Sequence, residues 1–532
     1  MAAPMSGSRS LRTYLIQFAN QHTDFRIAEF KALIDLFHAD IQWQEKDIHV
    51  NNPYLLVKMY SEESVRKIGS RSVLIKNIIE LWGHGTTYIE LNKSLRDTSR
   101  NVMAPHFVKE KSFKLELDAF NKKLSHLYKL EKFKNLPDDV LDFQGEVNLK
   151  NPDGTFYLLE DYGPYGSQPP DHPHHIYFGR QELCSIDANV KTCDDSLTNW
   201  DNPASSILAC IREEDTDCES EETDDIESEC DKSEVEPVIY ILFTANTSMD
   251  AGLSLLMANI GKVRKNHLIM DPFVGTGSLL VACAHNGAYV MGTDINYLLL
   301  HAKGKPSRAK QKKRESDESI QANLCQYGLG DFYIDAVVGD ASKHRMWRQQ
   351  SMFDAIITDP PYGIREKTKK VGTVEEDVEL TEDQKIGHVP QKIDYHLGQI
   401  FKDLLNFAAK FLHLGGRLVY WFPIDRRGYK EENIPTHPCL HCVANCEQVL
   451  NCRIARRLIT MEKVHQFEEI HQSDSAHVEV DHYEEVSFRQ MYFHTRKSKG
   501  HNSNEQMKIG NLGKQENNLP DKMAASSLAE NG

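Results

Sequence analysis

The sequence has few of the features that mark membrane, secreted or fibrous proteins. No stretch reaches the roughly 18 consecutive apolar residues that a membrane-spanning helix needs. The start, MAAPMSGSRS, lacks the apolar core of a secretory signal, so we do not expect secretion. The 11 cysteines are sparse in 532 residues and indicate reduced thiols rather than a disulfide framework. The 30 glycines and 20 prolines exclude collagen-like and proline-rich scaffolds.

Negative charge is abundant, and most of it lies in one segment. The net charge of −16 argues at first against a nucleic-acid partner. Residues 213–236, however, hold 14 Asp and Glu against one Lys, which leaves −3 for the other 508 residues. We expect this segment to be solvated and disordered, because it repels itself and has almost nothing to bury. It is either a plain acidic linker or a tail that competes with RNA for basic surface.

Composition and periodicity divide the chain into four parts. Length and a hydrophobic fraction of 40% suit roughly two to four folded domains. Strand and helix patterns alternate before the acidic segment, which predicts a basic α+β region without a catalytic constellation. Asp24 is the expected N-cap of a helix over 25–37, and residues 145–163 suggest a β-hairpin. The expected parts are 10–180, the atypical acidic span 181–245, a second domain at 246–465 and a polar, disordered tail at 466–532.

The second domain has the pattern of a doubly wound α/β fold. Short apolar runs occur at 268–270, 289–292, 336–338, 355–358 and 418–422. Such runs are typical of parallel strands that are buried on both faces. Helical patterns lie between them, for example in SLLVACAHNG and FKDLLNFAAKF.

A glycine loop predicts a nucleotide-type site at the end of the first of these strands. Asp271 ends the strand, Gly275 and Gly277 form the loop, and Asp294 ends the next strand 23 residues later. The glycines let the backbone approach a ligand, and the second acid suits two ribose hydroxyls. The third glycine of the dinucleotide fingerprint is missing, which favours S-adenosylmethionine over NAD. Asp340 either accepts a hydrogen bond from the adenine amine or caps its loop.

Asp359, Pro360, Pro361 and Tyr362 follow another buried strand and suit methylation of a planar exocyclic amine. The Asp359 carboxylate and the Pro360 carbonyl can each accept one N–H, which directs the nitrogen lone pair at the methyl group. The two prolines fix the backbone that carries both acceptors. Tyr362 can stack on the base. A strong base is unnecessary, because the nitrogen loses its proton after methyl transfer.

The chain resembles the eukaryotic tRNA (guanine-10-N2)-methyltransferases, in their catalytic subunit. The resemblance spans roughly residues 12–465 and rests on LWGHG, GEVNLK, LEDYG, HHIYFGR, NTSMDAGLSLLMANIGKV, DPFVGTGSLLVACAHNGAYVMGTDI, TDPPYGIRE, LLNFAA, LGGRLVYW, HPCL, ANCEQ and RRLITMEKV. It implies an α/β, Rossmann-like, S-adenosylmethionine-dependent methyltransferase domain after an N-terminal α+β ferredoxin-like and THUMP region. It also implies a cytoplasmic location, a tRNA substrate and a small zinc-binding activator subunit as partner.

The resemblance implies roles for individual residues. Asp271, Gly275 and Gly277 match the cofactor loop, and Asp294 matches the acid that binds the ribose. Asp340 matches the acid on the adenine side, and the tetrapeptide from Asp359 matches the site for the target amine. The span 181–245 departs from the family's pattern, since its last ten residues, EPVIYILFTA, which lead into NTSMD, lack a basic pair and a glycine.

Two further clusters are candidates for binding. Residues 303–314 hold seven basic side chains, and we expect Lys310, Lys312 and Lys313 to contact tRNA phosphates unless the loop is merely solvated. Cys439 and Cys442 have a zinc-like spacing with other Cys and His nearby, but they lie too close together for a zinc finger. We favour thiols of the core and predict no metal site.

Two other functions remain open at this point. The same tetrapeptide chemistry serves methylation of an adenine or glutamine amine. Alternatively, the unusual 181–245 span disables the enzyme and leaves a non-catalytic tRNA-binding protein.

Overall fold

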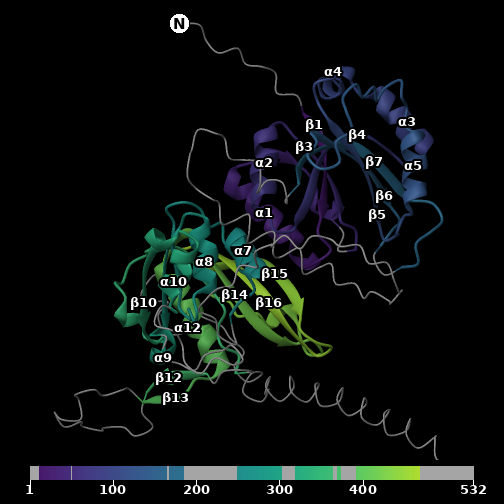
Figure 1. Cartoon of the computed structure of the whole chain (residues 1–532). Coiled ribbons are helices and arrows are strands. Elements are labelled where there is room, and N and C mark those ends of the chain that lie inside the picture. Colours follow the sequence, from purple (N-terminus) through teal and green to yellow (C-terminus); the bar gives the residue numbers. More distant parts are fainter. Residues whose placement is uncertain are drawn as a thin grey trace, which may run out of the picture.

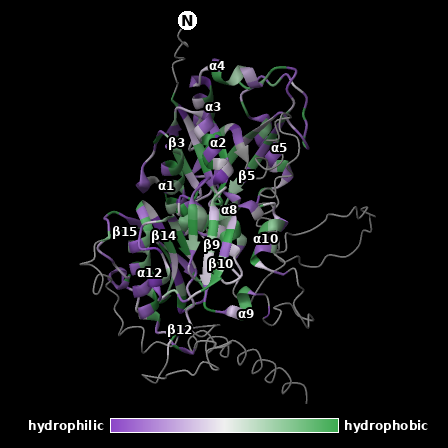
Figure 2. Ribbon diagram, turned by 90° about the vertical axis from the view of Figure 1, so that its left-hand side faces the viewer, coloured by the Kyte–Doolittle hydropathy of each residue, from purple (hydrophilic) through white to green (hydrophobic). Residues whose placement is uncertain are grey.

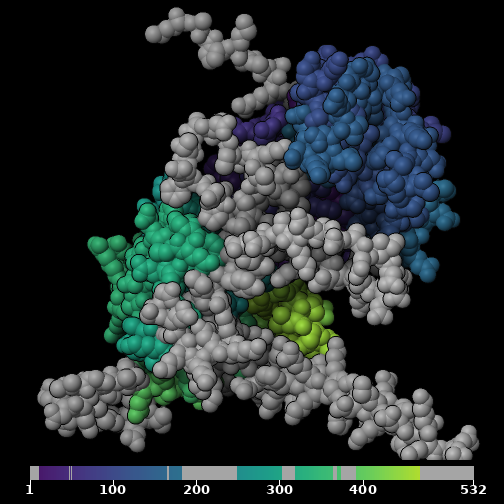
Figure 3. All heavy atoms as spheres, viewed as in Figure 1, coloured from purple at the N-terminus to yellow at the C-terminus, as the bar shows by residue number. Residues whose placement is uncertain are grey.

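The structure is a computed structural model that describes residues 11–48, 51–164, 167–184, 248–301, 303, 318–363, 368–372 and 391–467. The acidic segment 213–236, Lys310, Lys312, Lys313 and the tail beyond residue 467 lie outside this set. Two large sheets make up the fold, one in each half of the chain (Figure 1). Figure 3 shows the halves as separate colour blocks, blue for the N-terminal half and teal to yellow for the C-terminal half.

The N-terminal half forms a single seven-stranded mixed sheet in the order β2-β3-β1-β4-β7-β6-β5. Its strands are β1 (Arg12–Phe18), β2 (Ile41–Gln42), β3 (Tyr54–Met59), β4 (Ile75–Gly85), β5 (Phe113–Phe120), β6 (Gly154–Asp161) and β7 (His175–Cys184). The expected hairpin at 145–163 is wrong. β6 pairs parallel with β5 and antiparallel with β7, and residues 145–150 form no strand of their own. The turn residues in this stretch predict pairing between neighbouring segments, but the strands that pair with β6 come from elsewhere in the chain.

Short helices pack on this sheet, and side-chain caps start three of them. They are α1 (Arg26–Phe37), α2 (Glu62–Arg71), α3 (Tyr88–Asp97), α4 (Arg100–Met103) and α5 (His126–Lys134). Ser61, Thr87 and Ser125 each accept a hydrogen bond from a backbone N–H in the first turn of α2, α3 and α5. Asp24 does not cap α1 as expected. A 3-10 turn precedes the helix, and the Asp24 carboxylate accepts a hydrogen bond from the backbone N–H of Glu447 in the other half.

The second sheet has the order β10-β9-β8-β11-β14-β16-β15. Its strands are β8 (Leu268–Asp271), β9 (Tyr289–Asp294), β10 (Tyr333–Val338), β11 (Phe353–Thr358), β14 (Leu412–Asp425), β15 (Leu440–Val449) and β16 (Ile454–Lys463). The five strands from β10 to β14 run parallel, as predicted, and the last two are antiparallel. β10 is not buried on both faces as expected, because it lies at the edge and four of its six residues are exposed. The chain order reverses between β8 and β11, which is where such sheets bind ligands.

Helices cover both faces of the parallel sheet. They are α7 (Ala251–Ile260), α8 (Ser278–His285), α9 (Tyr297–Leu300), α10 (Ile320–Gln326) and α12 (Leu397–Phe411). α7 and α8 pack in one apolar cluster and α12 in another, which together sandwich β11 and β14. Figure 2 shows hydrophobic residues concentrated around α8 in the middle of the molecule. A small sheet of β12 (Lys369–Val371) and β13 (Lys392–Asp394) lies beside it.

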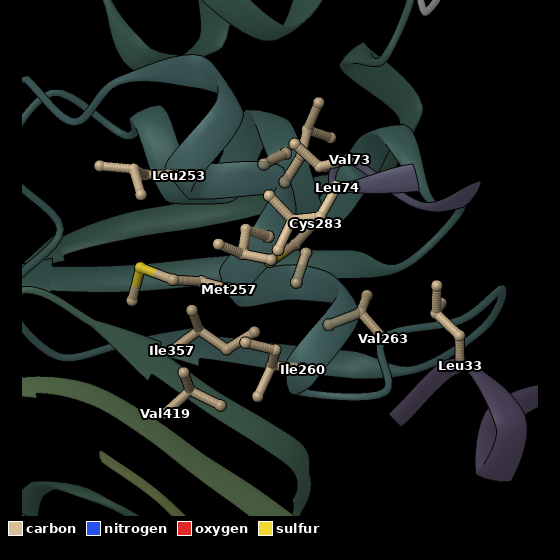
Figure 4. Close-up of a cluster of buried hydrophobic side chains, with 14 of the residues drawn as sticks. Leu33, Val73, Leu74, Leu253, Met257, Ile260, Val263, Cys283, Ile357 and Val419 are labelled. Atoms are coloured by element: carbon tan, nitrogen blue, oxygen red, sulfur yellow. The ribbon is translucent and has the colours of Figure 1, made fainter. Parts of the chain in front are cut away.

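The two halves share one hydrophobic core. A single cluster contains Leu33 of α1, Leu74 before β4, Met257 of α7, and side chains of β11 and β14 (Figure 4). The polar side chains at this junction are also paired across it. The buried Glu29 carboxylate accepts a hydrogen bond from Asn259 Nδ2 at 2.8 Å. We infer that the junction fixes α1 against α7, since both apolar and polar groups are buried there.

No helix within the described part of the chain combines the length and apolar character that crossing a membrane requires.

Candidate active site

The glycine loop joins β8 to α8 and takes a backbone shape that only glycine adopts easily. Gly275 and Gly277 have φ values of 53° and 80°. A Cβ atom on Gly277 would lie 2.7 Å from Ile320 Cγ2, so the position has no room for a side chain. A Cβ on Gly275, by contrast, would come no closer than 4.0 Å to another heavy atom, the Phe273 carbonyl oxygen. The loop therefore packs against α10 at Gly277 and has free space at Gly275.

Asp271 ends β8 as a buried carboxylate. Its Oδ1 accepts hydrogen bonds from the Thr358 hydroxyl at 2.6 Å and from the Phe273 N–H at 3.0 Å. Burial raises the pKa of Asp271 to about 7, although both hydrogen bonds oppose the shift. Thr358 immediately precedes the DPPY tetrapeptide, so Asp271 joins the glycine loop to it.

Asp294 ends β9 and supports the glycine loop from the other side. Its Oδ2 accepts the Gly275 N–H at 3.1 Å, and its Oδ1 accepts the Asn296 N–H at 2.7 Å. Burial raises the pKa of Asp294. Each carboxylate oxygen keeps a lone pair that suits the expected ribose hydroxyls.

Asp340 follows β10 and is also buried. Its Oδ1 accepts the Ser342 N–H at 2.9 Å, and its Oδ2 accepts the Val371 N–H of β12 at 2.7 Å. The loop-capping alternative therefore describes its contacts. Contact with an adenine amine stays a prediction, for which each oxygen still has a free lone pair.

Asp359 opens the tetrapeptide directly after β11. Its Oδ1 accepts a hydrogen bond from the Tyr362 hydroxyl, and its Oδ2 lies 3.3 Å from Arg456 Nη1. Burial raises the pKa of Asp359 to about 6, and the positive charge of Arg456 opposes that shift. The expected stacking of Tyr362 on a base remains a prediction. In the structure, the Tyr362 hydroxyl donates to Asp359 Oδ1, one of the two oxygens that could accept the target amine.

The fold brings the predicted acids together at the carboxyl ends of the parallel strands. Asp294, Asp271 and Asp359 end or follow β9, β8 and β11, which are consecutive in the sheet. Asp340 joins them because the Gly339 N–H donates to the Asp294 carbonyl at 3.0 Å. The arrangement lies at the point where the strand order reverses and can hold a nucleoside and a reacting group together.

Sequence reasoning missed Arg456 and Ser248. Ser248, just before α7, lies within hydrogen-bonding distance of the Thr276 hydroxyl at 2.9 Å, so the NTSMD motif contacts the glycine loop. Arg456 comes from β16, 97 positions after Asp359. The RRLITMEKV motif contains Arg456, but neither charge nor spacing in the sequence indicates which carboxylate it meets.

The cysteine cluster lies along β15, with Cys439 just before the strand and Cys442 and Cys446 within it. The His437 Nδ1 accepts the Cys439 N–H at 3.0 Å, Cys439 and Cys446 are buried, and Cys442 is exposed. No group of three or more Cys, His, Asp or Glu side chains within the described residues could hold a metal ion. Metal analysis of the purified chain tests the prediction that these are thiols of the fold.

Comparison with known proteins agrees with both halves of the fold. The family model for the "Tmrp11 THUMP N-terminal domain" matches residues 12–186, and that for the "RMKL-like, methyltransferase domain" matches residues 240–375. Neither match includes residues 187–239. The crystal structure of TrmN from Thermus thermophilus aligns over 85% of this chain and all of that chain, with 13% identity and a TM-score of 0.38.

Curated relatives match almost the whole chain. The human tRNA (guanine(10)-N(2))-methyltransferase TRMT11 is 42% identical over 92% of this chain and 96% of its own length. The Xenopus laevis protein of that name is 42% identical over 88% of both chains. The Dictyostelium discoideum protein of that name is 32% identical, over 88% of this chain and 85% of its own length.

The sheet order, the glycine loop and the family match define a Rossmann-like methyltransferase that uses S-adenosylmethionine, with a THUMP-type N-terminal region. The predicted fold class, enzyme class and cofactor are thereby confirmed. The chain belongs to the TRMT11 family of tRNA (guanine(10)-N(2))-methyltransferases.

Proposed function

We propose that the protein transfers a methyl group from S-adenosylmethionine to the exocyclic N2 amine of a guanosine in tRNA, at position 10 as its relatives' names state. The observation that carries this proposal is the placement of Asp359 directly after β11, the strand that pairs with β8, which ends at Asp271 before the glycine loop. A target amine at Asp359 and a donor at the loop would then lie side by side. Positioning of this kind supplies much of the rate of a transfer between two bound groups.

The residues present fit the cofactor. Gly275 leaves the loop open beneath a ligand, and Asp294 and Asp340 keep acceptor capacity at the neighbouring strand ends. When bound, S-adenosylmethionine supplies an electrophilic methyl group. We propose that Asp294 holds the ribose hydroxyls and Asp340 the adenine amine.

The tetrapeptide orients the acceptor. We propose that the Asp359 carboxylate and the Pro360 carbonyl each accept one N–H of the guanine amine, which directs the lone pair away from the ring plane. Tyr362 would stack on the base through its ring. Transfer would break the methyl–sulfur bond of the donor, with the electron pair staying on the sulfur as a neutral thioether, and one amine proton would then leave for solvent. Asp359 is ionised throughout, because it acts as an acceptor.

Methylation of unmodified tRNA tests this function. We expect Asp359→Ala to lower kcat by about 100-fold or more, because the preorganised acceptor of the amine N–H is removed, with tRNA affinity within a few-fold. Retained turnover would contradict the assigned role. Mass spectrometry of digested tRNA then identifies the product, because an adenine target, or a glutamine target in a protein, would leave N2-methylguanosine absent.

The non-catalytic alternative depends on the span 181–245, of which neither family model matches residues 187–239. A chain in which a Gly-Ser linker replaces residues 187–239 keeps both matched regions. Calorimetric titration with S-adenosylmethionine separates the alternatives. Binding by the full chain supports an enzyme, whereas binding by the linker chain alone shows that the span disables it.

We also propose a tRNA-gripping role for the N-terminal half and a cytoplasmic location, both from the family resemblance. Lys310, Lys312 and Lys313 remain candidates for phosphate contact. Charge reversal at these three lysines should weaken tRNA binding and flatten its dependence on salt. Unchanged affinity would remove that role.

We propose that the chain binds the activator subunit, and the exposed edge of the second sheet supports this proposal. β10 pairs only with β9 in the described sheet, and Figure 1 shows it at the outer edge. Ile334 is 51% exposed, and Val337 and Val338 are also exposed. An edge strand with exposed apolar side chains suits pairing with a strand from a partner. We therefore propose that the small zinc-binding subunit docks on β10.

Co-purification tests the docking site. Ile334→Lys should abolish the complex with the activator subunit in size-exclusion chromatography. Val449→Lys is the matched control, because Val449 is 52% exposed at the end of β15, on the opposite edge of the sheet. Loss of the complex in the control, with retention in Ile334→Lys, would place the subunit elsewhere.

A further inference from the structure

The candidate acceptor carboxylate has one cationic partner among the described residues. Arg456 Nη1 lies 3.3 Å from Asp359 Oδ2, and the two side chains are 14% and 24% exposed. The ion pair is therefore largely screened from water by protein. In such a pair each charge depends on the other for its stabilisation, because removing one partner leaves the other charge poorly solvated.

Three further contacts fix the Arg456 guanidinium. Its Nε donates to Gln448 Oε1 at 2.7 Å, and its Nη2 lies 3.7 Å from Met249 Sδ. Its central carbon lies 4.0 Å from the ring centroid of Trp421, which is a cation–π distance. Every nitrogen of the guanidinium thus has a partner. These contacts hold the planar guanidinium of Arg456 in one orientation. A lysine ammonium could replace its charge but not all of these contacts.

Trp421 also connects this support to the N-terminal half. Its ring lies 5.9 Å, centroid to centroid, from the ring of Phe25, just before α1. Met249, the third partner of Arg456, precedes α7, which packs on α1. The arginine therefore lies between the carboxylate and the elements that join the two halves.

We propose that Arg456 is a positioning residue for methyl transfer, which keeps the Asp359 carboxylate ionised and oriented toward the target amine. The inference rests on the proposed role of Asp359 as the amine acceptor. Arg456 acts through Asp359 and touches neither substrate nor cofactor in this scheme.

The reason is the balance between burial and charge. Burial favours the protonated form of Asp359, and a protonated carboxyl group donates from one oxygen rather than accepting. The charged and titratable groups that face Asp359 are Arg456, Tyr362 of its own loop, and Asp271, whose carboxylate disfavours a second negative charge. Asp250 in turn faces Arg456. Among these groups, Arg456 is the positive charge that favours the ionised acceptor, and the Tyr362 hydroxyl adds a donated hydrogen bond.

The test is the pH dependence of kcat/KM for Arg456→Met and Arg456→Lys with unmodified tRNA. We expect the acidic limb of Arg456→Met to move upward by about one to three pH units, and that of Arg456→Lys to move less. Activity of Arg456→Met should accordingly recover as the pH is raised, while tRNA affinity stays within a few-fold. If Arg456→Met does not fold, the shift in Arg456→Lys decides.

Arg457→Met is the matched control on the same strand. Arg457 lies over the ring of Tyr429 at 4.6 Å and bonds Asn445, away from Asp359. Its limb should match that of the wild type. A lower rate for Arg456→Met at every pH, with an unmoved limb, would overturn the inference and leave only a structural role. Turnover by Asp359→Ala, measured in parallel, would instead overturn the proposed function and the inference with it.

Discussion

The hydroxyl of Tyr362 donates a hydrogen bond to Oδ1 of Asp359, three residues earlier in the same tetrapeptide. Arg456 pairs with the other oxygen, so both acceptor atoms of the carboxylate are engaged in this structure. A guanine amine that uses Asp359 must displace the tyrosine hydroxyl or share Oδ1 with it. Sharing is chemically reasonable, because each carboxylate oxygen has two lone pairs.

Tyr362 therefore has two separable contributions, a hydroxyl on the carboxylate and a ring for the base. We expect Tyr362→Phe to keep kcat/KM within about five-fold, since the ring remains and Oδ1 is released. Tyr362→Ala should lose about 5- to 150-fold, because base–aromatic stacking contributes roughly 1–3 kcal/mol. Steady-state kinetics on unmodified tRNA distinguish them. Equal losses in the two variants would show that the hydroxyl, rather than the ring, is what matters.

Acid should inhibit the enzyme through Asp359. Its pKa is raised by burial to about 6, and protonation turns one of its two oxygens from an acceptor into a donor. kcat/KM should thus fall as the pH drops through about 6, approaching ten-fold per pH unit. Asp271, whose pKa is about 7, titrates nearby, so the profile is repeated with Asp271→Asn. A limb that persists near pH 6 in that variant assigns it to Asp359, whereas a lost limb assigns it to Asp271.

The same shifts have a consequence for stability of opposite sign. A carboxyl group whose pKa is higher in the folded state binds its proton more tightly there than in the unfolded chain. Its contribution to the free energy of unfolding is present below the ordinary value of 3.8 and is lost as the pH rises through about 6 for Asp359 and 7 for Asp271. The pH of highest activity is therefore not the pH at which these two sites are most stable.

The parts of the site that sequence predicts are those encoded in contiguous residues. The glycine loop, the DPPY tetrapeptide and the parallel strands each depend on a local pattern of turn residues or apolar runs, and the structure places them as expected. Local turn signals failed at 145–163, where β6 pairs with distant β5 and β7 instead of folding back as a hairpin. β10 shows the opposite limit. Its residues form the expected strand, but their burial depends on its edge position, which the sequence does not specify.

The contacts that sequence misses are long-range side-chain pairs. Arg456 meets Asp359 across 97 residues, and Asn259 meets Glu29 across 230. Each residue is ordinary in its own segment, so neither hydropathy nor spacing indicates a partner. Such pairs follow only from how the strands and helices pack.

Gly277 should be irreplaceable for two separable reasons. Its φ of 80° costs an alanine roughly 1–2 kcal/mol, and the added Cβ would also press on Ile320 at 2.7 Å. Gly415 is a matched control, because its φ is 79° but a Cβ there meets nothing within 4 Å. We expect Gly277→Ala to lower the melting temperature more than Gly415→Ala and to weaken S-adenosylmethionine binding. Equal melting temperatures would show that Ile320 moves aside at little cost.

Glu29 should stabilise the junction between the halves more than any exposed acid does. Its Oε1 accepts from the Val73 N–H and Asn259 Nδ2, and its Oε2 accepts from the Ser72 hydroxyl and the Leu74 N–H. A glutamine amide would turn one of these acceptors into a donor facing two donors. Buried groups left without partners cost about 1–3 kcal/mol each, so we expect Glu29→Gln to lose about 2–4 kcal/mol.

Glu45→Gln is the control for Glu29→Gln, because it breaks an exposed ion pair with Lys31. Exposed pairs contribute about 0–1 kcal/mol, so this variant should unfold nearly as the wild type does. Denaturant titration gives the free energy of unfolding of both variants, and scanning calorimetry shows how many transitions each has. Because Asn259 belongs to α7, loss of the Glu29 acceptor should also separate one cooperative transition into two. A Glu29→Gln loss no larger than that of Glu45→Gln would mean that the apolar cluster alone holds α1 on α7.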